Sequence, residues 1–403
     1  MSSDHRRVIV AGAGPVGLLV ALALAKQDVP VLVLEAESAL THDPRAGSFH
    51  PPSLEMMAPY GITDEMHRSA IRVPRWQIRD RVQGVVAEWD LGLLRDDTPY
   101  PYRLHLEQHR LTPMIYRRLQ PIPHAEVRFG IRVADFGQNT DGVWVLAATP
   151  GGTERFTGAW LIGADGGRST VRRLLNVEFD GFTWPERFVV VSSAHDFARD
   201  GYTSNAYVAD PEQWAAVFHM PDAGPPGLWR MAFPVPVDEP DAETLAPAAV
   251  EQRMQYFHPA PERYDVRYRS IYKVHQRVAK EFRRGRVLLA GDAAHLNNPL
   301  GAFGLNGGIH DAINLAQKLG KVWRGEGDAA LLDLYVRQRR TVNIEHVQEG
   351  SIRNLQILAE RDPAARGKHF DQLRRTAARA DSAKEYLLRS SMIASVRRAA
   401  TIT

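Results

Sequence analysis

Three glycines spaced two and three residues apart near the N-terminus form the first pattern in this sequence that could support chemistry. They lie between a β-branched run at 7–11 and an Ala- and Leu-rich run at 18–27, in the segment Gly12, Ala13, Gly14, Pro15, Val16 and Gly17. Gly12 permits a tight turn, Gly14 lets the backbone approach a pyrophosphate, and Gly17 lets a helix pack close to a strand. The amides at the helix start would attract phosphates. Glu35 ends the next apolar run, at the spacing where an acid accepts hydrogen bonds from an unphosphorylated adenosine ribose, so we expect a dinucleotide site.

Two later segments place an aspartate in a turn after a buried run. Asp165 follows an apolar run at 161–164 and begins an Asp-Gly turn, with arginines at the expected start of a helix. The turn could place Asp165 beside a phosphate-bearing ligand, or Asp165 could simply cap it. Asp292 follows the run at 286–290, at the strand end where ligands bind in such sheets. A glycine-rich loop and a helix start near Leu305 follow, and their backbone amides could face a ligand.

The composition restricts the chemistry that the chain can do by itself. Its 403 residues are 44% hydrophobic and 24% charged, which suits two closely packed domains. The net charge is only +3, and the arginines are dispersed apart from the C-terminal tail, so we expect no nucleic-acid partner. The absence of cysteine excludes disulfides, zinc fingers, iron–sulfur clusters and redox-active dithiols, and we expect no metal. Redox chemistry would therefore need a bound cofactor.

The apolar run at 8–25 resembles a signal peptide or a short membrane span. Glycines and a proline interrupt it, however, and a second apolar strand follows at once. We therefore expect a buried strand, turn and helix, no membrane span, and a cytoplasmic protein. The Arg- and Ala-rich stretch at 364–400 is most simply interpreted as solvated surface helices.

The order of the expected elements predicts an α/β fold, with a Rossmann-like dinucleotide-binding domain, an inserted antiparallel β-sheet domain and a helical C-terminal segment. Strand-like runs separated by proline and glycine turns indicate the antiparallel sheet, at 187–193, 204–209, 214–220 and 228–234. Further expected strands lie at 127–135 and 143–148, and expected helices at 53–60, 63–69, 111–119 and 307–319. We divide the chain into a dinucleotide-binding domain (1–75, 100–178 and 275–360), a substrate-binding sheet domain (76–99 and 179–274) and a C-terminal helical segment (361–403).

The three glycine segments, in this order and at these distances, resemble those of the single-component flavin aromatic hydroxylases, the family typified by para-hydroxybenzoate hydroxylase and salicylate hydroxylase. The resemblance runs from the first glycine turn to the helix after Asp311. It implies non-covalent FAD, with NADH or NADPH as a transient co-substrate that needs no second Rossmann domain. It also implies that a C4a-hydroperoxyflavin transfers one atom of molecular oxygen to a small aromatic or heteroaromatic substrate. A homodimer is compatible with this family.

The resemblance further implies contacts between individual residues and FAD. Glu35, with its neighbour Ala36, would hold the adenosine ribose, and Val133 would touch the adenine through its backbone. Arg45 and Gln108 would contact the FAD chain. The residues of the Gly12–Gly17 segment would surround the pyrophosphate.

Two aspartates and one loop complete the implied cofactor site. Asp165 would serve both FAD and the nicotinamide nucleotide, and Asp292 would bind the ribityl chain. The loop–helix junction under the flavin ring would comprise Ala302, Gly304, Leu305 and Asn306.

The group that activates the substrate is not identified by the sequence. A base or hydrogen-bond acceptor near a phenol is expected, and His219 and His295 are candidates, although each is more simply a structural histidine. Pro299 resembles the family proline whose carbonyl lines the substrate pocket. We expect the inserted sheet to wall the flavin face with Trp184, Tyr207, Trp214, Phe218, Trp229 and Met231. The polar groups that we expect near a flat ligand are His195, Tyr202, His219 and Arg230.

Other outcomes stay open beside hydroxylation. Related flavoproteins carry out epoxidation, oxidative decarboxylation or halogenation, but this chain lacks the Trp-x-Trp-x-Ile-Pro signature of the halogenases. A flavin-binding protein without turnover would bind FAD yet show no substrate-stimulated NAD(P)H oxidation. The chain departs from the family at Pro52, at Leu111-Thr112 and at Ala302-Phe303, and the last two leave the loop path and the substrate side open.

Overall fold

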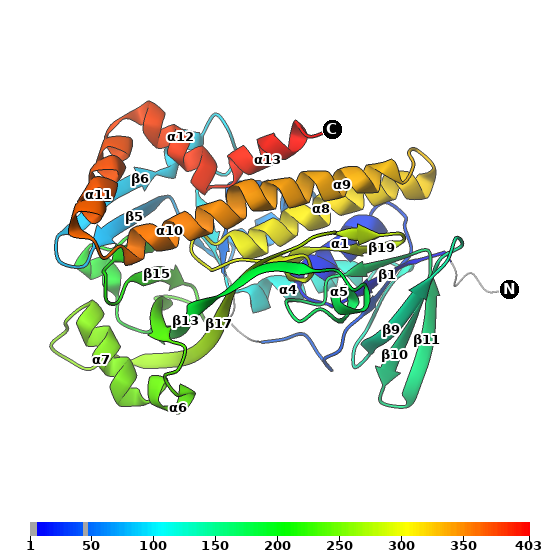
Figure 1. Ribbon diagram of the computed structural model, residues 1–403, viewed down its shortest axis with the longest axis horizontal. Helices are drawn as coiled ribbons and strands as arrows, with labels where there is room; N and C mark the ends of the chain where they lie inside the picture. Colours follow the sequence, from blue (N-terminus) through cyan, green and yellow to red (C-terminus); the bar gives the residue numbers. More distant parts are fainter. Residues whose placement is uncertain (1–5, 43–46) are drawn as a thin grey trace.

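A βαβ unit opens the fold, as the first glycine segment predicts. The computed structural model describes residues 6–42 and 47–403, shown in Figure 1. β1 (Val8–Ala11) pairs in parallel with β2 (Val31–Leu34), and α1 (Pro15–Ala25) connects them. All residues of both strands are buried, as expected for β-branched and leucine side chains in a parallel sheet that is covered on both faces.

Strands from distant parts of the chain complete this parallel sheet. Its order is β18-β19-β12-β1-β2-β8, with the edge strand β18 antiparallel to its neighbour. The added strands are β8 (Ala125–Arg128), β12 (Trp160–Gly163), β18 (Arg283–Arg284) and β19 (Val287–Leu289). Two helices, α4 (Gln108–Leu119) and α8 (Phe303–Arg324), pack against α1. The third glycine segment, which leads into α8, is thereby brought beside the first.

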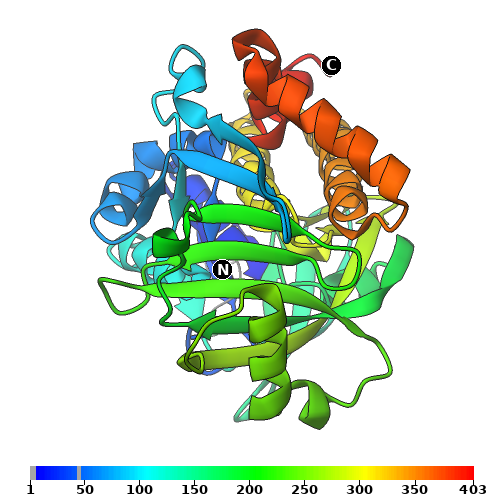
Figure 2. The same cartoon turned by 90° about the vertical axis from the view of Figure 1, so that its left-hand side faces the viewer.

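A mostly antiparallel eight-stranded sheet forms the second unit and faces the viewer in Figure 2. Its order is β20-β17-β13-β16-β15-β14-β5-β6, and β14 and β5 pair in parallel. The strands are β5 (Arg75–Asp80), β6 (Gly84–Asp90), β13 (Phe179–Ser193), β14 (Asn205–Ala209), β15 (Ala215–Met220), β16 (Leu228–Pro236), β17 (Val266–Ala279) and β20 (His295–Leu296). Two short sheets complete the fold: β3 (Ser48–Phe49), β7 (Arg103–His105) and β4 (Ile71–Val73) form one, and β11 (Gly152–Gly158), β10 (Val143–Thr149) and β9 (Arg132–Gln138) form the other.

The two faces of the large sheet pack against different helices. On the outer face, Val189 and Val191 pack with Met254 and Phe257 of α7 (Pro247–Phe257), which follows α6 (Asp241–Thr244). On the inner face, Phe188 and Val190 belong to a cluster that the C-terminal helices complete. Because side chains alternate along β13, one strand contributes to both cores.

The C-terminal segment is helical, as predicted, and Figure 1 shows it in orange and red above the large sheet. It contains α9 (Ala330–Val342), a π-helical turn (Asn343–Gln348), α10 (Glu349–Ala359), α11 (Pro363–Ala378), α12 (Ala380–Ser390) and α13 (Ile393–Ala400). These helices are more than a solvated surface layer, because Phe370, Leu373 and Leu387 are buried against the inner face of the sheet. The remaining helices are α2 (Pro51–Met57), α3 (Ile62–His67) and α5 (Thr170–Leu174).

Several element boundaries differ from those expected. The strand expected at 127–135 is broken into β8 and β9, because Gly130 turns the chain with a φ of +71°. α8 begins at Phe303, directly after Ala302, whose φ is +56°; this is two residues before the helix start expected near Leu305 and four before the expected helix at 307–319. α4 begins at Gln108, not at Leu111. Every helix in the described part of the chain is too short or too polar to span a membrane.

Candidate functional site

The first glycine segment forms an open turn in front of α1. A β-carbon on Gly12 would lie 2.5 Å from the Ala164 carbonyl oxygen, and one on Gly17 would overlap the Gly12 carbonyl oxygen. A β-carbon on Gly14 would meet no described atom within 4 Å. Gly14 is the N-cap residue of α1, and the described residues supply no side-chain cap for this helix. Unsatisfied amides and free space therefore meet at one point, and a pyrophosphate fits there.

Glu35 lies directly beside this turn. Its Oε2 accepts a hydrogen bond from the Ala13 amide at 2.6 Å, and its backbone carbonyl accepts one from Ile131 at 2.7 Å. The segment after Ile131 leads into β9, in which Val133 is buried. The positions expected to hold adenosine are thus neighbours, with Ala36 half-buried next to Glu35. Gln108 is half-buried at the first position of α4, and Arg45 lies outside the described residues.

Asp165 caps the short helix of the second glycine segment. Its carboxylate accepts hydrogen bonds from Ser169 Oγ at 2.5 Å and from the backbone amides of Thr170 at 2.7 Å and Val171 at 3.1 Å. The buried Arg172 donates to the Ala293 carbonyl at 2.9 Å, which ties this segment to the third. The capping interpretation therefore accounts for the contacts of Asp165 seen in the fold, and its contact with nucleotides stays a prediction.

The third segment is packed directly against the first. β-Carbons on Gly291 and Gly308 would lie 2.9 Å and 2.5 Å from a methyl group of Val16, so both glycines permit this close approach. Asp292 is exposed at the end of the strand. α8 starts at Phe303 and has no side-chain cap from the described residues, so the first-turn amides around Gly304 and Leu305 point toward the loop.

The Asn306 side chain connects the start of α8 to the segment of β3 by hydrogen bonds. Its Oδ1 accepts a hydrogen bond from the His50 amide at 2.9 Å. Its Nδ2 donates to the carbonyls of Ser48 at 2.8 Å and Ala302 at 2.7 Å. The side chain therefore fixes the loop–helix junction, at which Ala302 is held in a left-handed conformation.

A group of buried polar residues lies next to this junction. β3 and β7 pair so that Ser48 is opposite His105, and Arg103 is two residues before His105 on the same face. Ser48, His50, Arg103 and His105, which we call the polar face, are all buried. Each has one buried side-chain atom without a hydrogen-bond partner in the described part of the chain: Ser48 Oγ, His50 Nδ1, Arg103 Nε and His105 Nε2. Buried polar atoms are rarely left unpaired, so this face indicates a polar ligand or bound water.

A small cavity connects the polar face with the large sheet and the C-terminal helices. Its lining residues are Trp76, Arg103, Tyr207, Gly301, Phe303, Asn354, Tyr386 and Ser390. Gly301 is held from two sides, because its amide donates to the Tyr207 hydroxyl at 2.5 Å and its carbonyl lies 2.8 Å from His50 Nε2. Tyr386 stacks on Trp89 at a centroid distance of 4.5 Å. The cavity thus opens at the third glycine segment between aromatic walls.

Burial controls the protonation of the groups around the cavity. Desolvation, reinforced by the nearby Arg103 charge, holds the pKa of His50 well below its usual range. Desolvation likewise lowers the pKa of His105 to about 3. It raises the pKa values of Tyr207 and Tyr386. At neutral pH these four groups are uncharged, and Arg103 carries the positive charge.

Comparison with known proteins identifies the family. Residues 5–349 match the family model described as FAD binding domain. The chain belongs to the family of FAD-dependent aromatic hydroxylases. This hydroxylase is therefore a flavoprotein monooxygenase, with NAD(P)H as the co-substrate of its family.

Relatives match this hydroxylase over most of its length. It is 38% identical over 360 residues to the para-nitrophenol 4-monooxygenase of Pseudomonas sp. (strain WBC-3), with 89% of each chain covered. It is 36% identical over 363 residues to the 6-hydroxy-3-succinoylpyridine 3-monooxygenase of Pseudomonas putida, with 90% of this chain and 91% of that one covered. The crystal structure of p-nitrophenol 4-monooxygenase from Pseudomonas putida aligns with a TM-score of 0.91 at 36% identity, over 95% of this chain and 96% of that one.

The residues expected to activate the substrate make structural contacts in this hydroxylase. His295 is fully buried, with Nε2 2.7 Å from Asp311 Oδ2, and Asp311 also accepts from Arg339 Nε at 2.6 Å. His219 stacks on Trp229 at 4.6 Å, and its Nε2 lies 2.7 Å from the Pro226 carbonyl. The Pro299 carbonyl accepts a hydrogen bond from the Ala302 amide at 2.9 Å. A catalytic role for any of the three stays a prediction.

The expected aromatic wall is split between the two faces of the large sheet. Trp184, Tyr207, Trp214 and Phe218 belong to the inner cluster beside the cavity, whereas Trp229 and Met231 pack on the outer face. Grouping all six on one wall was wrong, because the choice rested on residue type and not on the alternation of side chains along each strand.

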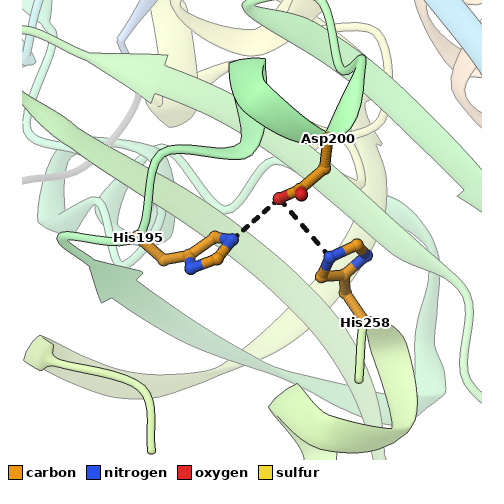
Figure 3. A group of neighbouring side chains, drawn as sticks. All are labelled: His195, Asp200 and His258. Carbon is orange, nitrogen blue, oxygen red and sulfur yellow. Dashed lines mark hydrogen bonds and ion pairs between the residues drawn. The ribbon is translucent and has the colours of Figure 1, made fainter. Parts of the chain in front are cut away.

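Two of the polar groups expected near the ligand, His195 and Tyr202, also lie on the outer face. Figure 3 shows His195 and His258 pointing toward Asp200, with their Nε2 atoms 2.8 Å and 3.4 Å from Asp200 Oδ2. Tyr202 packs with the same outer core. These residues do not line the cavity. Arg103 and Tyr386 line it instead, and sequence reasoning missed both, because no motif marks them and their burial depends on the tertiary fold.

Proposed function

We propose that this monooxygenase oxygenates a phenol or hydroxypyridine with a single ring, bound in the cavity between Arg103 and Phe303. The observation that carries the proposal is the position of the cavity. The loop before α8 forms one side of it, next to the helix start that would lie under the flavin ring, and Trp76, Tyr207 and Tyr386 form aromatic walls. A flat ring with a polar substituent suits these surroundings.

The relatives of this chain favour a single-ring substrate. The two relatives described above are named for single rings that bear a hydroxyl group, para-nitrophenol and 6-hydroxy-3-succinoylpyridine. Both names place the new oxygen on the ring carbon para to the hydroxyl, and we propose the same position here.

The chain holds FAD and shields the reaction through residues already described. The turn at Gly12–Gly17 would bind the pyrophosphate, Glu35 the ribose and Asp292 the ribityl chain. Bound FAD supplies electron transfer from NAD(P)H and the activation of molecular oxygen. The first-turn amides of α8 would stabilise negative charge at the flavin ring, and the aromatic walls would exclude water from it.

The domain division expected from the sequence is part of this proposal. The large sheet includes β5, β6 and β13 to β17, which supports a substrate-binding unit inserted into the dinucleotide-binding unit. β17 runs to Ala279 and β20 adds residues 295–296, so the strands of this sheet continue past residue 274. The homodimer stays a prediction, and light scattering of the purified holoprotein tests it.

A substrate panel tests the proposed activity. NADH and NADPH oxidation is followed with substituted phenols, hydroxybenzoates and hydroxypyridines, and products are analysed by mass spectrometry under labelled molecular oxygen. We expect stimulated NAD(P)H oxidation and one labelled oxygen atom in the product, at the para carbon. Stimulation by no compound of the panel, or conversion of all consumed oxygen to peroxide, would contradict the proposal.

A further inference from the structure

Arg103 is a buried cation without a carboxylate partner. The residue is 2% exposed, and Nη2 donates a hydrogen bond to the Ser390 carbonyl at 3.2 Å. The guanidinium also lies 5.3 Å from the ring centroid of Trp76. Across residues 6–42 and 47–403, no carboxylate forms an ion pair with it, and Nε has no acceptor. Buried charges are normally paired, so this cation, on the wall of a cavity, indicates an anionic ligand.

The ionisable groups around Arg103 do not supply that anion. Those that face it are His50 before α2, His105 on β7, Tyr207 on β14 and Tyr386 on α12. All four are neutral at pH 7, for the reasons given above. Two further cations contribute positive charge here: Arg230 acts to lower the pKa of His105, and Arg353 acts to lower the pKa of Tyr386. The described part of the cavity therefore has a positive potential, which favours a negatively charged substrate over a neutral one.

We propose that Arg103 activates the substrate by binding its ring hydroxyl as the phenolate. This inference rests on the proposed function. The O–H bond of the phenol breaks and its proton passes to solvent water as the substrate is bound, while the electron pair stays on the oxygen next to the guanidinium. That pair raises the electron density at the ortho and para ring carbons, which is where electrophilic oxygen is added. No residue of the chain has to act as a base.

Arg103 has donors available for an anionic oxygen. Nη2 donates to the Ser390 carbonyl, and the buried Nε has no acceptor among the described residues. An anionic oxygen accepts strong, charge-assisted hydrogen bonds from such N–H groups, and the ring hydroxyl of the proposed substrate supplies that oxygen when it is deprotonated. The Tyr207 hydroxyl accepts from the Gly301 amide, so its own hydrogen can be donated into the cavity.

The protonation state of a bound probe tests this assignment directly. The holoenzyme is titrated with 4-nitrophenol at several pH values, and the difference spectrum reports whether the bound probe is the phenol or the phenolate. An opposite charge at close range typically lowers a pKa by about 1–3 units, so we expect a shift of that size in the bound probe. A bound probe that titrates at its solution pKa or above would overturn the proposal.

Three variants show whether Arg103 causes the shift. In Arg103→Met the shift disappears and phenolate binding weakens by roughly 100-fold. Arg103→Lys keeps the charge and most of the shift. Arg72→Met is the control, because Arg72 is an exposed arginine on the neighbouring strand β4, and it should behave as wild type. A wild-type shift in Arg103→Met would overturn the assignment.

Further measurements separate the alternatives. If Arg103→Met does not fold, the affinity of the wild-type enzyme is measured for a series of phenols of increasing acidity. The proposal requires that the more acidic phenols bind more tightly at pH 7, because a larger fraction of each is present as the phenolate. If Arg103 instead binds a carboxylate, benzoate binds tightly and the phenol group of bound 4-hydroxybenzoate stays neutral, which overturns the proposal. NAD(P)H oxidation stimulated by a neutral bound phenol contradicts only this inference, whereas stimulation by no phenol and no hydroxypyridine contradicts the proposed function.

Discussion

The guanidinium of Arg103 donates a hydrogen bond to the backbone carbonyl of Ser390, at 3.2 Å, and thereby joins β7 to the last residue of α12. One turn earlier on α12, Tyr386 stacks on Trp89 and Trp76 of the large sheet, at centroid distances of 4.5 Å and 5.8 Å. The C-terminal segment is therefore a wall of the cavity. A wall that excludes water has a measurable role in oxygen transfer, because water promotes the loss of peroxide.

Replacing Tyr386 should uncouple NAD(P)H oxidation from product formation. Tyr386→Ala removes an aromatic ring from the wall, admits water, and should shift consumed oxygen from product to hydrogen peroxide. Truncating a large aromatic side chain in a core typically costs about 3–5 kcal/mol, an upper limit here because Tyr386 is only partly buried. Oxygen uptake, peroxide and product are measured together. Tyr386→Phe keeps the stack and should stay coupled, and equal peroxide yields in both variants would contradict this role.

Two glycines of the first turn should respond differently to valine. Gly14→Val places a side chain in open space, so the apoprotein should fold but not take up FAD, because the pyrophosphate can no longer approach. Gly17→Val overlaps the Gly12 carbonyl oxygen and should destabilise the fold itself. Flavin fluorescence titration and thermal unfolding of the apoproteins distinguish the two effects. FAD binding of wild-type strength by Gly14→Val would argue against this turn as the pyrophosphate site.

Alanine variants of Asp165 and Asp292 should distinguish a residue that stabilises a helix start from one that binds the cofactor. Asp165→Ala leaves the N-cap Ser169 of α5 in place but removes the carboxylate that accepts from the Thr170 and Val171 amides, and should lower the free energy of unfolding of the apoprotein by about 0.5–2 kcal/mol. Asp292→Ala changes an exposed residue at the end of the strand and should weaken FAD retention more than Asp165→Ala does. Urea unfolding and dialysis against FAD give both quantities. The assignment of Asp292 fails if its variant binds FAD as tightly as wild type does.

The apoprotein should lose stability as the pH falls below about 6.5. His50, His105 and His310 have pKa values lowered by burial, the last two to about 3. Their folded-state pKa values lie below the unfolded value, so the unfolded chain takes up protons first and stability is lost between pH 6.5 and the folded pKa. From pH 7 to pH 5 each histidine should cost about 2 kcal/mol.

Urea unfolding at the two pH values measures this loss. His310→Gln provides the comparison, because the variant should show a smaller loss than wild type, by about the contribution of one histidine. A pH dependence that is unchanged in the variant would show that His310 is not held neutral in the fold.

The features that were predicted correctly depend on residues that are close together in the sequence. Gly12, Gly14 and Gly17 act within one turn, so their spacing indicates both the βαβ unit and the open side of the turn. Trp229 was assigned to the wrong face because the face depends on strand register, which residue type does not specify. Arg103 was not found, because an arginine in a three-residue strand is usually exposed. Its burial results from β14 and α12, which are far away in the sequence.

The wall supplied by α12 has a consequence for how the protein is made. During translation the glycine turn and β7 leave the ribosome early, but the neighbours of β1 on one side, β12 and then β19, emerge much later, and the far wall of the cavity follows after residue 380. Pairings this distant form only once both partners have been synthesised. A nascent chain therefore has no closed cavity. The dinucleotide-binding sheet and the aromatic wall of the cavity are both completed only after residue 286 has been synthesised.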